Sequence, residues 1–401
     1  MAFAMTDFDA TRRLFDLPRG VIYLDGNSLG PLPRGVTERV HRTLCDEWGR
    51  MVITGWNRAG WIDMPRHLGD RIGTLIGAAP DTVVLGDTLS IKVYQALAAA
   101  LDMRPDRRVI LSDTGNFPSD LYMAQGLVKM LGDRHELRVV APEDVARAMD
   151  GDLAVLMLTE VDYRTGRRHD MPALTAQAHD LGALAIWDLA HSAGALPVDV
   201  TAGKADFAVG CTYKYLNSGP GGPAFIYVAP DHADVATPAL SGWLGHAAPF
   251  DFEPGYRAGA GIDRMRVGTP PILQLAALDA ALNVWEDVDM ADVRARSIEL
   301  SERFIARVEA GCPDLTLASP RDPDRRGSQI SFRFAHGYAV IQALIAEGVI
   351  GDFRAPDIMR FGITPLYLSH DDIDRATEIL ADIMQTRKWD QPVFHTRQTV
   401  T

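Results

Sequence analysis

The chain has 401 residues, of which 47% are hydrophobic and 23% charged, so it can bury a large core and should form about two or three domains. Its formal net charge of −13 disfavours nucleic acids and anionic membranes as partners. No run of about 18 apolar residues predicts a membrane span, and no apolar core with a cleavage site predicts secretion, so we expect a cytoplasmic protein.

The cysteine and histidine spacings give no sign of a metal site. Cys45, Cys211 and Cys312 are far apart and form neither a disulfide framework nor a CxxC pair. His179 and His191 belong to different predicted elements. Neither set has the ligand spacing of a zinc site, so we expect no bound metal.

Residues from 80 to 265 alternate short apolar runs with amphipathic runs. The apolar runs are rich in Val, Ile and Leu and end at polar or Gly/Pro turns, as buried strands do. They are Arg108–Ser112, Leu137–Val140, Leu153–Thr159, Ala183–Trp187, Phe207–Cys211 and Ala224–Val228. Helical patterns such as Asp120–Leu131 and Pro172–Leu181 lie between them. This alternation predicts an α/β domain with a mostly parallel central sheet and helices on both faces.

The last third of the chain has a different pattern. Two long helices are predicted at Thr269–Trp285 and Ala291–Glu309. Strand-like SQISFRF, a helix at Tyr338–Glu347, strand-like IMRFGIT and a helix over 371–384 follow, which is an α+β pattern. We therefore expect an N-terminal arm and helix at 1–50 packing with the small domain, a large domain at 51–275, and a smaller C-terminal domain at 276–401.

An aspartate and a lysine each follow an apolar run. Asp188 comes directly after ALAIW, and Lys214 comes three residues after FAVGC. In a parallel sheet such positions lie at the carboxyl edge, where α/β proteins place ligands. An enzyme that uses pyridoxal phosphate (PLP) needs a carboxylate at the pyridine nitrogen and a lysine at the aldehyde carbon. Alone, Asp188 could be a helix cap or turn residue, and Lys214 a solvated lysine; together they predict a PLP site.

Two turns supply further candidates for such a site. Asp87-Thr88-Leu89-Ser90 joins a strand to a helix that begins near Ile91, and a helix N-terminus with a hydroxyl favours phosphate. It could equally be an ordinary capped helix. In Asn116–Asp120, Phe117 could stack on a flat ring, although Pro118, Ser119 and Asp120 also suit a plain helix start.

Several segments carry a resemblance to a known family. They are YLDGNSLGPLP, FPSD at 117–120, VDYRTG, WDLAHSAGALPVDV, CTYKYLNSGPGGPAFIYV, SGWLGH, GIDRMRVGTPPI and GDFRAPDIMRFGITPLYLS. With these segments the sequence resembles the bacterial-type kynureninases along nearly its whole length. FPSD and TYKYLN together are specific to that family. The resemblance implies the aspartate aminotransferase fold, fold type I, with PLP as cofactor.

The resemblance also implies roles for individual residues. Lys214 would carry the cofactor as a Schiff base, and Asp188 would hold the pyridine nitrogen, with Asp120 and His191 near the ring. Phe117 would stack on the ring, and Pro118 and Ser119 would belong to the same cofactor-binding turn. Leu89, Ser90 and Tyr213 would bind phosphate, and Thr159 would lie near the ring oxygen. Tyr213 could also relay a proton, a role compatible with phosphate binding.

In the family, a second subunit completes the site. Trp243 and Thr269 would reach the cofactor phosphate of the neighbouring subunit, which implies a homodimer with shared active sites. Arg360 would bind the substrate α-carboxylate, and Trp61 and Gly268 would lie near the substrate. One departure stands out, since Lys92 occupies a place where the family often has Asn.

The implied reaction is hydrolysis of L-kynurenine to anthranilate and L-alanine in tryptophan breakdown. The region of Trp61 and the pair Gly268-Thr269 resemble the bacterial branch of the family. That resemblance implies a preference for kynurenine over 3-hydroxykynurenine. Two alternatives stay open. A cysteine desulfurase or related lyase of the same fold would need a reactive cysteine, for which Cys312 is the candidate, although a structural thiol is the simpler interpretation. A PLP-binding protein without catalysis would have no need for Arg360.

Overall fold

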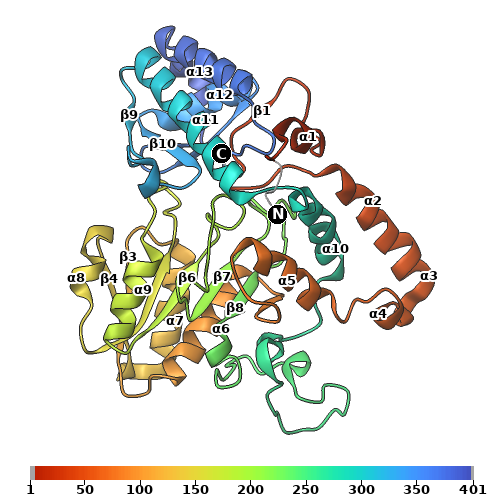
Figure 1. Ribbon diagram of the computed structural model, residues 1–401. Helices are drawn as coiled ribbons and strands as arrows, with labels where there is room; N and C mark the ends of the chain where they lie inside the picture. Colours follow the sequence, from red (N-terminus) through yellow and green to blue (C-terminus); the bar gives the residue numbers. More distant parts are fainter. Residues whose placement is uncertain (1–4, 399–401) are drawn as a thin grey trace.

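A seven-stranded sheet forms the centre of the computed structural model, which describes residues 5–398 (Figure 1). Its strand order is β2-β8-β7-β6-β5-β3-β4. The strands are β2 (Val83–Leu85), β3 (Val109–Asp113), β4 (Glu136–Val140), β5 (Leu153–Thr159), β6 (Leu184–Asp188), β7 (Phe207–Gly210) and β8 (Phe225–Val228). Only β8 runs antiparallel to its neighbours, so the mostly parallel sheet predicted from the sequence is confirmed.

Helices cover both faces of this sheet because its inner strands are apolar on both sides. Along β5, Leu156 and Leu158 join one apolar cluster, while Val155 and Met157 join the other. Helices α6 (Leu89–Asp102) and α7 (Pro118–Leu131) pack on the second cluster, and α5 (Met64–Leu75) and α9 (Met171–Asp180) on the first. The strand ends near α6 and α7 are therefore held from both sides.

The C-terminal part contains a separate antiparallel sheet, drawn in blue in Figure 1. Its order is β12-β13-β10-β9, and long helices pack beside it. The elements are β9 (Thr316–Leu317), β10 (Gln329–Arg333), β12 (Asp352–Arg354), β13 (Ile358–Gly362), α11 (Met290–Gly311), α12 (Gly337–Ala346), α13 (His370–Gln385) and α14 (Pro392–His395). This is the predicted α+β pattern.

One predicted helix is shorter than expected. The periodicity predicted a helix from Thr269, but α10 spans Ile272–Ala281 and continues as the 3₁₀ helix η8 (Leu282–Trp285). Pro270 and Pro271 explain the difference, because proline lacks the N–H of a helix interior and disfavours helical backbone in the residue before it.

The N-terminal segment packs against the C-terminal part. Strand β1 (Ile22–Tyr23) pairs in parallel with β11 (Val349–Ile350), and Arg12 of α1 (Phe8–Arg13) forms an ion pair with Asp372. The chain continues through α2 (Arg34–Arg42), the π-helix η1 (Thr43–Trp48), α3 (Gly49–Met51), η2 (Val52–Thr54) and α4 (Gly55–Arg58). The domain boundaries stay a prediction, and their ends at 1–4 and 399–401 lie outside the described residues.

Short helices complete the connections. They are η3 (Gly132–Arg134), η4 (Pro142–Asp144), α8 (Val145–Ala148), η5 (Pro230–His232), η6 (Trp243–Gly245), η7 (Gly261–Met265), η9 (Pro323–Arg325) and η10 (Lys388–Asp390). Across residues 5–398, no helix has the length and apolar character needed to cross a membrane.

Candidate active site

Asp188 and Lys214 meet at the carboxyl edge of the central sheet. Asp188 is the last residue of β6 and pairs in register with Thr159, the last residue of β5. Lys214 lies in the loop after β7, and its Nζ is 2.9 Å from Nε2 of His191. The apolar strands end together at this edge, so the polar residues that follow them converge. Asp188 and Lys214, which are 26 residues apart in the sequence, therefore lie close together in the structure.

The Asp188 carboxyl is buried beside a second carboxyl, that of Asp120 in the first turn of α7. Burial raises the pKa of Asp188 to about 6, although the charge of Lys214 and the backbone N–H of Ala190 oppose the shift. Burial and the charge of Asp188 raise the pKa of Asp120 well above its usual range. The two carboxyls thus share a proton, with the negative charge mainly on Asp188.

His191 faces Lys214 as a neutral ring. Burial and the charges of Lys214 and Arg360 lower the pKa of His191 well below its usual range. A neutral ring beside an ammonium accepts the hydrogen bond at Nε2, which leaves the proton on Nδ1. That Nδ1 is buried without a partner, as is Oδ1 of Asp120. Buried polar atoms of this kind usually have a partner, so these two point to a missing polar ligand.

Phe117 stands at the start of α7, beside the lysine. Its ring is half exposed, with the Lys214 Nζ 5.9 Å from the ring centroid and the Tyr163 ring in edge contact at 5.1 Å. Asn116, for which no separate role was predicted, fixes this turn. Its Oδ1 accepts from the Phe117 N–H at 2.7 Å, and its Nδ2 donates to Ser112. Pro118 is the first residue of α7.

The predicted phosphate turn places two helix N-termini side by side. Leu89 and Ser90 are the first residues of α6, whose cap Thr88 makes no side-chain capping bond. The Ser90 hydroxyl is 2.8 Å from that of Ser119 in the first turn of α7. Free N–H groups at helix starts and two hydroxyls make a suitable anion site.

Lys92 points into the protein below that turn. It is fully buried, with Nζ donating to Gln95 at 2.9 Å and to the Met265 carbonyl at 3.2 Å, and lying 3.5 Å from Asp87. Burial lowers the pKa of Lys92 to about 8. It therefore joins α6 to the end of η7 rather than serving as a free phosphate ligand.

Tyr213 and Thr159 flank the lysine. The Tyr213 ring centroid is 5.9 Å from the Lys214 Nζ, and the neighbouring Cys211 thiol and burial raise the pKa of Tyr213 above its usual range. The Tyr213 hydroxyl is therefore a proton donor at neutral pH. Thr159 Oγ1 is buried and donates to the Val161 carbonyl at 3.2 Å.

Arg360 of β13 is buried and already held by the protein. It forms an ion pair with Asp352 of β12, donates to Ser28 Oγ at 2.9 Å, and donates to the Tyr163 carbonyl at 2.6 Å. Its Nε is buried without a partner. Arg354 also pairs with Asp352, at 2.9 Å. Sequence reasoning did not find Ser28, Asp352 or Arg354 as neighbours of Arg360, although all three lie in the segments that carry the resemblance.

Four of the predicted residues lie outside this cluster in the single chain. Trp243 is 40% exposed and packs its ring against Phe250, and Gly268 and Thr269 are exposed. Trp61 is buried and donates to Glu47 Oε2 at 2.9 Å. Trp61 also borders a cavity of about 280 Å³ with Trp48 and Ile272.

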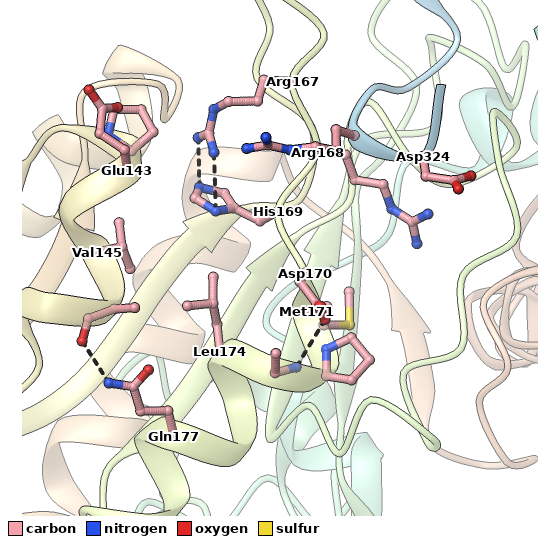
Figure 2. A pocket seen from close by; sticks show the side chains of 15 residues that line it. Glu143, Val145, Arg167, Arg168, His169, Asp170, Met171, Leu174, Gln177 and Asp324 are labelled. Carbon is pink, nitrogen blue, oxygen red and sulfur yellow. Dashed lines mark hydrogen bonds between the residues drawn. The ribbon is translucent and has the colours of Figure 1, made fainter. Parts of the chain in front are cut away.

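Another cavity has a different lining. It measures about 740 Å³ and lies between α8, α9 and the segment 167–170, where Arg167 bonds to His169 (Figure 2). Neither Lys214 nor Asp188 lines it. Within the described part of the chain, no three His, Cys, Asp or Glu side chains gather in a way that could hold a metal ion.

The donor set fits PLP. The site offers a lysine amine, a buried carboxylate for the ring nitrogen, an aromatic ring and paired helix N-termini for phosphate. Similar solved structures include a cysteine desulfurase from Thermococcus onnurineus, with TM-score 0.81 and 19% identity over 96% of this chain and 100% of that one. A C-DES mutant with glycine linked to its PLP has TM-score 0.79 and 19% identity over 92% and 99%. Fold and site define a PLP-dependent enzyme of fold type I.

Sequence relatives narrow the class further. The model of the Kynureninase C-terminal domain matches residues 293–380. The chain is 50% identical over 397 residues to the kynureninases of Pseudomonas fluorescens and Burkholderia mallei, covering 97% of this chain and 95% of each relative. The chain belongs to the kynureninase family.

Proposed function

We propose that this enzyme hydrolyses the Cβ–Cγ bond of L-kynurenine, giving anthranilate and L-alanine. The observation that carries the proposal is 50% identity to kynureninases over nearly the whole chain, together with the Lys214–Asp188 constellation. Kynurenine is the preferred substrate in this proposal, and 3-hydroxykynurenine a secondary one.

Bound PLP supplies an electron sink for the charge that develops when bonds to the substrate carbons break. Lys214 would hold the aldehyde carbon of PLP. Asp188, together with Asp120, would hold the ring nitrogen, and Phe117 would cover one face of the ring. Leu89, Ser90, Ser119 and Tyr213 would hold its phosphate, with Pro118, Thr159 and His191 beside them. The shared proton of Asp120 and Asp188 supports this assignment, because it keeps a negative charge available at that nitrogen.

Lys214 and Tyr213 would each carry out a different proton transfer. Lys214 would hold the cofactor until the substrate is bound, and its free amine would then take the proton from the substrate Cα. Water would be added across the Cβ–Cγ bond, with its oxygen going to Cγ as the new carboxyl and a proton going to Cβ. Lys214 would return a proton to Cα, which gives L-alanine. Tyr213 suits the transfer to Cβ, since its raised pKa keeps the hydroxyl protonated near Lys214. Arg360 would hold the substrate α-carboxylate through its fork of donors.

The desulfurase alternative has little support in the environment of the cysteines. Cys312 is buried at the end of α11, and burial raises the pKa of its thiol to about 11. Cys211 is buried as well, and burial raises the pKa of its thiol. A nucleophilic cysteine needs an accessible, low-pKa thiolate.

We further propose a homodimer with shared sites. Trp243, Gly268 and Thr269 are exposed, and Phe250, Phe252 and Tyr256 add exposed aromatic surface on the same segment, which extends away from the sheet in Figure 1. Such a surface suits a second subunit. Trp61 as a substrate contact and the cytoplasmic location stay predictions.

The direct experiment mixes the PLP-loaded protein with L-kynurenine or 3-hydroxy-L-kynurenine and follows anthranilate fluorescence and L-alanine. The expected result is one alanine per aryl product, with faster turnover of L-kynurenine. The variant Tyr213→Phe should turn over about 10²–10⁴-fold more slowly. A wild-type protein that binds PLP and releases neither product would refute the proposed reaction.

A further inference from the structure

The segment from Leu24 to Gly30 joins the two halves of the site. At one end, the Leu24 carbonyl accepts from the N–H of Gly362, two residues after Arg360. At the other end, the Gly30 N–H donates to the Tyr213 carbonyl at 2.7 Å, next to Lys214. The side chains between these bonds therefore lie between Arg360, which would bind the substrate carboxylate, and Lys214, which would hold the cofactor.

Close packing fixes this segment in place. A Cβ on Gly26 would lie 2.2 Å from the Tyr367 hydroxyl, and one on Gly30 would lie 2.3 Å from the Lys214 carbonyl. In addition, the Ser28 hydroxyl contacts both Asp352 and Arg360. The backbone around residue 25 has little freedom to move, so the direction of the Asp25 side chain is set by the fold.

Asp25 is the acidic residue of this segment. Its Oδ1 is shielded from solvent and has no hydrogen-bond partner. Burial raises the pKa of its carboxyl to about 6, although a hydrogen bond with Ser28 and the charges of Arg360, Arg354 and Lys214 oppose the shift. The nearby arginines are paired with Asp352, however, and among residues 5–398 no ion pair within 4.0 Å involves Asp25. A shielded carboxylate without a cation is costly, so a cationic ligand would be favoured there.

We propose that Asp25 binds the α-ammonium group of the amino acid substrate, so that Asp25 and Arg360 together recognise a zwitterion. This inference rests on the proposed function, because it assigns Arg360 to the substrate carboxylate and Lys214 to the carbon next to the amine. An amino acid presents its ammonium and carboxylate on one carbon, and the segment 24–30 places an anion between the two cationic groups that would meet them. Asp25 thereby selects amino acids over simple keto acids.

The test compares ligands with and without the α-amine: L-kynurenine and L-alanine carry it, and 4-(2-aminophenyl)-4-oxobutanoate lacks it. PLP-loaded wild type, Asp25→Asn and the control Asp16→Asn are assayed for KM and kcat on L-kynurenine. Calorimetry gives the Kd of the amine-free analogue and of L-alanine. Asp16 is exposed on the same N-terminal segment, so its variant controls for the loss of one charge.

We expect Asp25→Asn to raise the KM for L-kynurenine and the Kd for L-alanine about 10-fold or more, as loss of a charged hydrogen bond does. The Kd of the amine-free analogue should change by less than about 2-fold, since that ligand makes no contact with an ammonium-binding group. Asp16→Asn should alter none of these constants. If Asp25→Asn does not accumulate, Asp25→Glu replaces it and should weaken L-alanine more than the analogue.

Equal weakening of L-alanine and the analogue would overturn the inference, because it would mean that Asp25 only supports Arg360. Unchanged binding of both would overturn it as well. Failure of the proposed function has a separate signature: wild-type protein would release no anthranilate, whatever the two calorimetric constants are.

Discussion

Lys214 would perform two tasks, because it would hold the PLP aldehyde carbon and would also take the Cα proton. Its surroundings allow both. Its contact with His191 is a hydrogen bond that the neutral ring accepts, because burial and nearby positive charges keep His191 unprotonated. The negative charge of this carboxyl pair, Asp188 and Asp120, lies mainly on Asp188, and the proton that the pair shares lies mainly on Asp120. The lysine amine is therefore free to exchange partners, while the carboxylates stay fixed on β6 and α7.

Replacement of Lys214 tests its covalent role. Lys214→Ala should lose the borohydride-reducible link to PLP and nearly all turnover, because it removes the amine that lies beside His191 at the sheet edge. The cofactor should still bind without a covalent bond through the helix N-termini of α6 and α7. Mass spectrometry after reduction measures the link. Lys129→Ala, on the exposed side of α7, is the matched control and should keep it. A reducible adduct in Lys214→Ala would assign the role to another lysine.

Arg360 allows a second test at the same scale. Arg360→Lys keeps a positive charge beside Asp352 but loses the planar fork, so the KM for L-kynurenine should rise about 10-fold or more. Arg354→Lys is the comparison, since Arg354 contacts the same carboxylate from the exposed side. Steady-state kinetics gives both constants. An unchanged KM in Arg360→Lys would show that another group binds the carboxylate.

Among the elements, α6 has the most unusual attachment. Its first turn faces the predicted phosphate site, and one turn later the buried Lys92 bonds to the Met265 carbonyl. Gln95 Nε2 donates to the same carbonyl at 3.2 Å. These bonds fix the start of α6 relative to the segment that leads to Gly268 and Thr269. Lys92 is a departure from the family pattern, and its position gives it a structural role.

The lowered pKa of Lys92 predicts a pH dependence of stability. An unfolded lysine keeps its proton up to about pH 10.5, whereas native Lys92 releases it near pH 8. Between these values the unfolded state binds more protons, so the free energy of unfolding rises with pH. The contribution is about 3 kcal/mol across the window. Lys92→Met should lack this rise and Lys129→Met should keep it, in urea unfolding from pH 7.5 to 10. Parallel curves for wild type and Lys92→Met would contradict the assignment.

The strands of the sheet could be predicted because each apolar run is long enough to form a buried strand and ends in polar residues. The same logic placed Asp188 and Lys214 at one edge, and the structure agrees. It could not find the neighbours of Arg360. Ser28 and Asp352 are 332 and 8 residues away from it, and they meet only because β1 pairs with β11 and β12 with β13. No local pattern carries that information.

At the scale of the whole molecule, a single chain does not bring all the predicted site residues together. Trp243 and Thr269 are exposed, while Lys214, Asp188 and Asp120 are gathered at the sheet edge. In an isologous dimer each subunit can give such a segment to its partner's site. A shared site makes a prediction about mixtures of two damaged subunits that separate sites do not make.

Mixing Lys214→Ala with Trp243→Ala protein tests this arrangement. If Trp243 serves the partner's site, a mixed dimer contains one fully intact site, formed by Lys214 of one subunit and Trp243 of the other. Random exchange at equal amounts gives mixed dimers half of the time, so activity should recover to about a quarter of the wild-type value. Native mass spectrometry verifies the exchange. As a comparison, Phe252→Ala replaces Trp243→Ala in the mixture, since Phe252 is another exposed aromatic residue of that segment. If the Lys214→Ala and Trp243→Ala mixture exchanges fully but shows only the sum of the separate activities, each site is built from a single chain.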